Sequence, residues 1–221
     1  TIYGADDSFA VIASSTMEGK YLGLIPRDSI FFYPGSRIRS DIIAAHPDIA
    51  AVSLFRNGLR GLSIKVNDRV PIARWCGSTP SVASASTTMA IENCYLFDAS
   101  GFIYVSAGTA DPLNAFVVYV PLAVEGNPIG STLPNASKLP AAFDFARQLT
   151  LLGSPVTTIV FRHDEVDDYV QSGTRITYLL GNEQVAYTAL KSASSNLNLT
   201  DGSLKYIDLR FDGKVYLKRK E

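Results

Sequence analysis

Apolar residues at strand and helix spacing divide the first part of the chain into short elements. The run FAVIA (residues 9–13) favours a short β-strand, and a weak helical stretch follows over residues 16–24. A second helix is expected from a cap at Ser36 to His46-Pro47, where the proline ends it. The apolar face of this helix carries Ile38, Ile42 and Ile43. A strand and two helices are therefore expected first.

Two strands complete this part of the chain. AAVSLFR (50–56) precedes LSIKVND (62–68), in which apolar and polar residues alternate strictly, and Asn57-Gly58 between them is a strong hairpin signal. The order strand–helix–helix–strand–strand predicts a helical pair packed on one face of a three-stranded sheet. We assign this arrangement to a domain over residues 1–71.

The pattern after Pro71 is β-rich and contains two helical segments. Strands are expected at 72–76, 94–98, 102–106, 116–124, 156–163, 168–172 and 175–180. Helices are expected over 140–152 and from Asn182 to about Ser194. The fold class is therefore α+β: an N-terminal βααββ domain is followed by a larger β-rich domain with two helices, over residues 72–221.

The chain ends in a predicted hairpin. LKYIDLRF (204–211) and KVYLKRK (214–220) flank the turn signal Asp212-Gly213. The first strand is expected to place Ile207, Leu209 and Phe211 on one face. The second strand is expected to lie at the edge of its sheet, where unpaired N–H and C=O groups can accept a partner strand.

The side chains of this edge strand are expected to alternate between two faces. Lys214, Tyr216 and Lys218 point to one face, and Val215 and Leu217 to the other. The basic end favours an acidic partner segment. An alternative is that the lysines only protect an open edge against aggregation.

Composition excludes several classes of protein. Hydrophobic residues make up 47% of the chain and charged residues 19%, so it can bury a core and is not disordered. The net charge is −1 and no basic stripe is present, which argues against nucleic-acid binding. No apolar run reaches the roughly 18–20 residues that cross a bilayer. The sequence starts at Thr1 and not at a methionine, as a mature or trimmed fragment does, so a membrane anchor could have been removed upstream.

Cys76 and Cys94 are the only cysteines of the chain. The residues between them are rich in serine, threonine and alanine and nearly uncharged, as in a surface loop between two strands. A disulfide between the two is predicted, and it would place this region in an oxidising compartment. Two unrelated buried thiols are the alternative.

No catalytic residue, metal site or cofactor is expected. The common nucleophile, zinc-protease and phosphate-binding motifs are absent. His46 is read as a helix-end residue. His163 precedes an acidic run over 164–168 that could bind a hard cation through carboxylates. However, the run lacks the glycine and glutamate spacing of a calcium loop, so a solvated turn between two strands is the preferred interpretation.

Three motifs in this order resemble the bacterial cell-division family FtsQ, called DivIB in Gram-positive bacteria. The first is a helix ending at a proline, then a strand with V-x-L-x-R spacing, then an acidic/Arg-Pro-x-A sequence before Trp75. The second is the hairpin YLFDASGFIY (95–104), and the third is the strand IDLRF (207–211). Together they cover nearly the whole chain.

The resemblance implies a POTRA domain followed by a β domain, both outside the cytoplasm, in a single-pass cell-membrane protein of the division septum. Members of the family are not enzymes. They hold the small membrane proteins FtsB and FtsL and help to regulate septal peptidoglycan synthesis, and FtsB adds a strand along the last strand of the β domain. The alternatives are a POTRA-containing accessory of a secretion or membrane-assembly system, and a secreted β-rich adhesion domain.

The residues that the resemblance and the edge position assign to partner binding surround the last turn. Phe211 and Tyr216 are expected to anchor the added strand, because buried aromatic side chains dominate such interfaces. Arg210 could pair with a partner carboxylate or act within the sheet. The full set is Arg210, Phe211, Gly213, Lys214, Val215, Tyr216 and Leu217.

Overall fold

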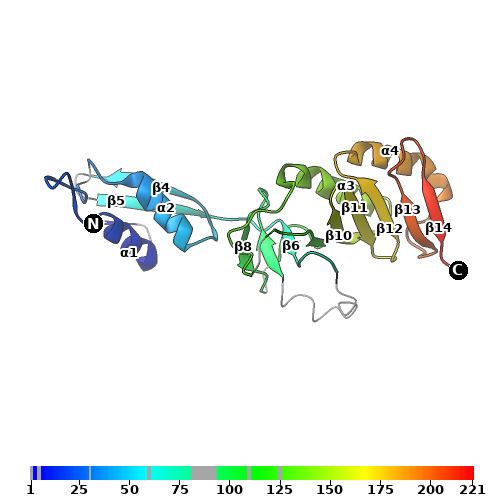
Figure 1. Cartoon of the computed structure of the whole chain (residues 1–221), viewed down its shortest axis with the longest axis horizontal. Coiled ribbons are helices and arrows are strands. Elements are labelled where there is room, and N and C mark those ends of the chain that lie inside the picture. Colours follow the sequence, from blue (N-terminus) through cyan, green and yellow to red (C-terminus); the bar gives the residue numbers. More distant parts are fainter. Residues whose placement is uncertain are drawn as a thin grey trace. The chain divides into compact units, whose positions relative to one another are not determined.

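A computed structural model describes most of the chain. The described residues are 2–3, 6–29, 31–58, 61–80, 94–108, 111–123 and 126–221. The chain divides into two compact units, Thr1–Arg69 (unit 1) and Val70–Glu221 (unit 2) (Figure 1). Each unit has a hydrophobic core of its own. The sequence pattern predicted a boundary between residues 71 and 72, two residues later than the observed boundary between Arg69 and Val70. The α+β class is confirmed.

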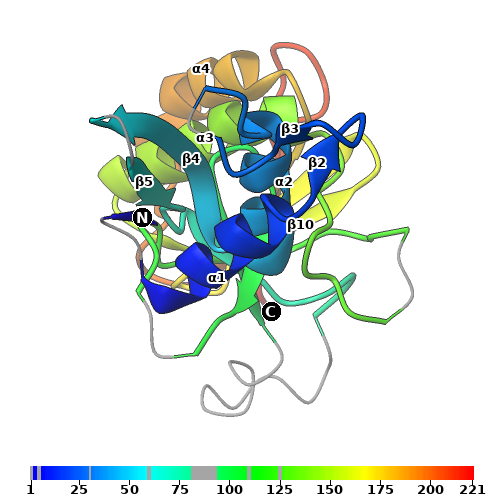
Figure 2. The same cartoon turned by 90° about the vertical axis from the view of Figure 1, so that its left-hand side faces the viewer.

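Unit 1 is a three-stranded sheet with two helices and a small hairpin. Its elements are β1 (Ile2–Tyr3), α1 (Asp7–Thr16), β2 (Lys20–Tyr21), β3 (Ile25–Pro26), α2 (Gly35–Ala45), β4 (Ile49–Asn57) and β5 (Gly61–Asp68). The sheet has the order β1-β5-β4, with β1 parallel and β4 antiparallel to β5. Both helices lie on one side of this sheet (Figure 2), so the expected helical pair on a three-stranded sheet is confirmed.

The expected strand at 9–13 and the expected helix at 16–24 are wrong. Residues 9–13 lie inside α1, whose core-facing residues have helical and not strand spacing. These residues are Phe9, Ile12 and Ala13, and Met17, the C-cap of the helix, continues the same spacing. The helix ends before Gly19, whose φ of +93° glycine adopts easily, and the chain then forms the β2–β3 hairpin. The first strand of the sheet, expected at residues 9–13, is instead β1, which pairs with β5.

The second helix and the following hairpin confirm the sequence pattern. Helix α2 ends at Ala45, before His46-Pro47, and buries Ile38 and Ile42 completely. Ser36 does not cap this helix but lies within its first turn. Leu62 and Ile64 of β5 are buried, as their alternation predicts.

Unit 2 is built on one mixed sheet of nine strands. Its strands are β6 (Ala73–Trp75), β7 (Tyr95–Phe97), β8 (Ile103–Ser106), β9 (Val117–Tyr119), β10 (Val156–Arg162), β11 (Glu165–Val170), β12 (Arg175–Leu179), β13 (Leu204–Asp208) and β14 (Tyr216–Arg219). Its helices are α3 (Leu139–Leu151), α4 (Glu183–Ala193) and the short 3₁₀ turns η2 (Ala136–Lys138) and η3 (Ser194–Asn196). The sheet order is β14-β13-β12-β11-β10-β9-β6-β7-β8.

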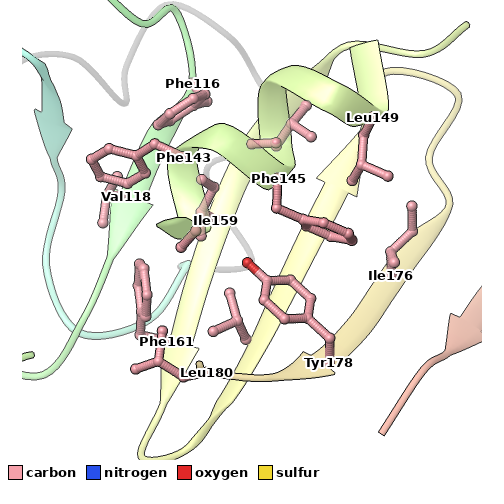
Figure 3. Close-up of a cluster of buried hydrophobic side chains, with 14 of the residues drawn as sticks. Phe116, Val118, Phe143, Phe145, Leu149, Ile159, Phe161, Ile176, Tyr178 and Leu180 are labelled. Atoms are coloured by element: carbon pink, nitrogen blue, oxygen red, sulfur yellow. The ribbon is translucent and has the colours of Figure 1, made fainter. Parts of the chain in front are cut away.

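The core of unit 2 lies between α3, α4 and one face of this sheet. Phe143, Phe145 and Leu149 of α3 point toward the strands (Figure 3). The ring centroids of Phe145 and Tyr178 are 4.5 Å apart, and those of Phe143 and Phe116 are 5.1 Å apart. The expected helix over residues 140–152 is therefore confirmed, with each end one residue earlier in the chain.

Several strands of unit 2 differ from their expected bounds. The expected strand at 116–124 is limited to the three residues of β9, which lies between β6 and β10 and is parallel to both. Strand β11 begins at Glu165 and so takes up most of the acidic run. Strand β13 ends at Asp208, so Leu209 and Phe211 lie beyond it.

Candidate functional site

Strand β14 forms one edge of the nine-stranded sheet, so the C-terminal edge strand is confirmed. It pairs antiparallel with β13, with Tyr216 opposite Asp208 and Leu217 opposite Ile207. All four of its residues are exposed. Because only one side of the strand is paired, its other side offers backbone N–H and C=O groups to a partner.

The alternation of hydrogen bonds identifies which amides face outward. Lys220 donates its backbone N–H to the carbonyl of Ser203, toward β13. In an antiparallel strand the direction of the N–H groups alternates, so Lys218 and Tyr216 also point toward β13. The N–H groups of Leu217 and Arg219 then point toward the open edge.

Two aromatic side chains meet at the start of this edge. Phe211 and Tyr216 pack edge to face, with ring centroids 5.2 Å apart and planes at 78°. Their exposed fractions are 52% and 49%. The expectation that Phe211 lies on the face of Ile207 and Leu209 is wrong, because β13 has ended and the chain is turning. The turn instead brings Phe211 to β14.

The strand expected at 214–220 was predicted to begin two residues too early. Lys214 donates its N–H to the carbonyl of Phe211, which closes a turn that contains Gly213 at a φ of +66°. Val215 packs partly against the core of unit 2. The strand itself runs from Tyr216 to Arg219, because the turn after β13 consumes the residues before Tyr216.

The side chain of Arg210 is held against the protein by hydrogen bonds to two carboxylates. Its Nε donates to Asp208 Oδ1 at 2.9 Å and its Nη2 to Asp208 Oδ2 at 2.6 Å, while Nη1 donates to Glu165 Oε1. The hydrogen bonds from Arg210 lower the pKa of Asp208, and those to Asp208 and Glu165 raise the pKa of Arg210. Arg210 was expected either to pair with a partner carboxylate or to act within the sheet. The structure shows the second, because its guanidinium is bonded to Asp208 and Glu165.

The same polar network continues across the sheet face that lies away from the helices. Arg162 bridges Glu165 at 3.1 Å and Asp167 at 2.8 Å. Asp167 also accepts a hydrogen bond of 2.6 Å from the hydroxyl of Thr177. These contacts fix the side chain of Arg210 relative to β10–β12. Because Phe211 is the next residue in the chain, they also restrict its position.

A groove lies beside the edge, and the sequence interpretation missed it. Its volume is about 860 Å³, and it is bounded by the turn before β14 and by the outer face of α4. Its lining residues are Gln184, Val185, Thr188, Ala189, Ser192, Ala193, Asp212, Gly213 and Val215. A signal was present: Val185, Ala189 and Ala193 recur at four-residue spacing, although Val185 is 47% exposed.

The predicted disulfide between Cys76 and Cys94 is present. The two Cα atoms are 4.3 Å apart, and the bond links the segment after β6 to the start of β7. Residues 81–93 of the intervening loop lie outside the described residues. The bond indicates an oxidising, extracytoplasmic location. Among the described residues, no helix combines the length and the apolar character that a membrane span requires.

The interpretation of the acidic run as a solvated turn between two strands holds for its start at residue 164 but is wrong for residues 165–168. Asp167 and Asp168 lie in β11 and are 3% and 0% exposed. Neither carboxylate oxygen of Asp168, nor the hydroxyl of Tyr178, has a hydrogen-bond partner among the described residues. Burial, then the charges of Asp167 and Glu183, raise the pKa of Asp168 well above its usual value. A carboxyl group buried in this way cannot meet a substrate from solution.

The acidic run does not form a metal centre within the described ranges, where no three His, Cys, Asp or Glu side chains converge. The turn at the start of the run, with His163 at a φ of +56°, borders an open basin that Ser78, Thr79 and Pro121 line on its other side. No model of a known protein family matches the chain, and none of the curated proteins matches it.

The candidate site is the open edge of β14 together with the Phe211–Tyr216 pair, because this edge combines unpaired backbone groups with exposed aromatic side chains.

Proposed function

We propose that this chain is the extracytoplasmic part of a non-enzymatic cell-division scaffold of the FtsQ/DivIB kind. Such a protein is anchored in the cell membrane upstream of Thr1 and acts at the division septum. Its unit 1 serves as a POTRA-type domain. Its unit 2 binds small membrane proteins of the FtsB and FtsL kind by strand addition at β14 and so helps to regulate septal peptidoglycan synthesis.

The observation that carries this proposal is the open edge of β14 beside the Phe211–Tyr216 pair. A partner strand would satisfy the outward N–H groups of Leu217 and Arg219, which gives affinity. Half-exposed aromatic side chains at the start of the edge can anchor the partner, since such residues contribute most to interfaces. Lys214, Lys218, Arg219 and Lys220 favour an acidic segment. The order of elements in unit 1 agrees with a βααββ domain that carries an extra hairpin.

The test is binding of the FtsB-like protein of the same organism to the chain, measured by calorimetry. Leu217→Pro removes one outward N–H donor and leaves the bonds to β13 intact, so we expect binding to weaken at least about tenfold. Leu217→Ala is the matched control, because it shortens the same side chain but keeps the N–H group. The double variant Phe211→Ala, Tyr216→Ala should also weaken binding.

The fold of each variant is checked by circular dichroism. Equal losses in Leu217→Pro and Leu217→Ala would show that the side chain matters and the backbone pairing does not. Undiminished binding by both the proline variant and the double aromatic variant would move the interface away from β14. No binding by the unaltered chain would reject the proposed partner.

A further inference from the structure

Unit 1 exposes a group of large apolar side chains that its core does not use. Leu22 and Leu24, in the turn of the β2–β3 hairpin, are 97% and 82% exposed. Leu22 also has a φ of +50°, a conformation that a leucine rarely adopts. Phe31 and Phe32, just after the hairpin, are 59% and 58% exposed. Exposing such a group to water does not stabilise a monomer. Exposed apolar groups of this kind mark surfaces that contact another apolar surface or a membrane.

These side chains gather at one pole of unit 1. Helix α1 starts with Phe9 beside His46, at the end of α2, and therefore runs back toward the start of α2. The hairpin follows α1 at that end (Figure 2). The guanidinium carbon of Arg56, near the end of β4, lies 5.4 Å from the centroid of the Phe31 ring. The opposite pole holds Asp68, from which the chain continues to unit 2.

The base of the hairpin has the composition of a membrane-interface anchor. Lys20 is the first residue of β2 and Arg27 directly follows β3, and the guanidinium of Arg27 lies 5.1 Å from the centroid of the Tyr21 ring. Among the described residues neither cation forms an ion pair. The segment 18–41 carries four cations and three acids, a small positive excess in a chain whose net charge is −1. An apolar tip above an aromatic and cationic base matches the layers of a bilayer surface.

We propose that the β2–β3 hairpin inserts Leu22 and Leu24 into the surface of an anionic lipid bilayer, with Lys20 and Arg27 at the level of the phosphate groups. A convex tip suits a deformable lipid phase, whereas a protein partner would need a matching hollow. The unpaired cations give charge complementarity to anionic headgroups. An anchor upstream of Thr1 would enter at this same pole, because Ile2 pairs with Leu62 at the start of β5. The proposal does not depend on the partner proposed for β14.

The test is co-sedimentation of the whole chain with vesicles. One set contains phosphatidylglycerol and phosphatidylcholine in equal parts, and the other contains phosphatidylcholine alone. We expect binding to the first set and weaker binding to the second. The double variant Leu22→Asn, Leu24→Ser should bind the first set at least about tenfold more weakly. Asparagine is chosen at position 22 because it tolerates positive φ, so the fold is preserved.

The matched control is Leu113→Ser, Leu151→Ser, which removes two leucines of unit 2 that are 73% and 82% exposed. It should bind vesicles as the unaltered chain does. Lys20→Glu should weaken binding to the anionic vesicles and leave binding to phosphatidylcholine unchanged. Three results would overturn the proposal: no vesicle binding by the unaltered chain, equal losses in the two leucine pairs, or a dimer in light scattering that only the hairpin variant dissolves. The last would make the hairpin an interface between two copies of this chain.

Discussion

The cores of the two units are built from different kinds of side chain. The buried core of unit 1 is entirely aliphatic, with residues such as Ile38, Ile42 and Leu54. The core of unit 2 adds aromatic rings, and all seven buried polar or charged residues among those described lie in unit 2. Apolar burial depends little on pH, whereas buried titratable groups couple stability to it. The comparison therefore predicts that only unit 2 responds strongly to pH and to redox conditions.

The largest expected effect comes from a cavity in either core. Ile42→Ala should destabilise unit 1, and Leu149→Ala should destabilise unit 2, each by about 3 kcal/mol, because both residues are 0% exposed. The only tryptophan, Trp75, is in unit 2, so its fluorescence follows unit 2 alone, while far-ultraviolet circular dichroism follows both units. If Ile42→Ala shifts the tryptophan transition as much as Leu149→Ala does, the two units do not unfold separately.

Loss of the disulfide should have the next largest effect, and on unit 2 only. The double variant Cys76→Ala, Cys94→Ala opens a loop with a sequence separation of 18 residues. The expected cost is about 3 kcal/mol in the free energy of unfolding. Urea unfolding followed by tryptophan fluorescence measures it. Dithiothreitol should lower the stability of the unaltered chain and have no effect on the double variant; a drop in both would point to a cause other than this bond.

A pH titration separates the two cores further. The pKa of Asp168 is raised in the folded state, so the folded form holds its proton more tightly than the unfolded form. Stability is then highest below the unfolded pKa and falls as pH rises above it. Asp168→Asn should remove this dependence, and the stability difference between variant and unaltered chain should grow with pH by up to about 1.4 kcal/mol per unit. Unfolding of unit 2 by urea between acid and neutral pH measures the difference.

Asp208→Asn is the matched control of opposite sign. The pKa of Asp208 is lowered, chiefly by the hydrogen bonds from Arg210, so its contribution is present above the unfolded pKa and is lost as pH falls through the folded pKa. This variant should therefore be less stable than the unaltered chain at neutral pH and equal to it in acid. Parallel pH curves for the two variants would contradict both assignments.

The smallest expected effect is a gain in unit 1. Leu22→Asn should raise its stability by about 1 kcal/mol, because asparagine tolerates the positive φ that strains leucine. Leu24→Asn makes the same change two residues away, where φ is not positive, and should give no gain. Thermal unfolding followed by circular dichroism measures both. A gain at both positions would mean that polarity, and not backbone strain, sets the stability of this turn.

Local pattern was sufficient for the elements whose apolar residues recur at a clear period. Helix α2 and strand β5 follow from the spacing of Ile38, Ile42, Leu62 and Ile64, and the disulfide follows from two cysteines at the ends of a nearly uncharged loop. The C-terminal strand was placed at a sheet edge, although its start was set too early. These features depend on contacts close in sequence, which composition and spacing encode directly.

Only the tertiary structure decided the features that depend on distant neighbours. Residues 9–13 have strand propensity, yet they form a helix because α2 and the sheet offer an apolar surface at helical spacing. Asp168 is buried because β11 pairs on both sides and helices cover that face, which its acidic neighbours in sequence could not indicate. The groove beside α4 and the hydrogen bonds that hold Arg210 join segments up to 45 residues apart. Such contacts are set by packing and not by the local order of residues.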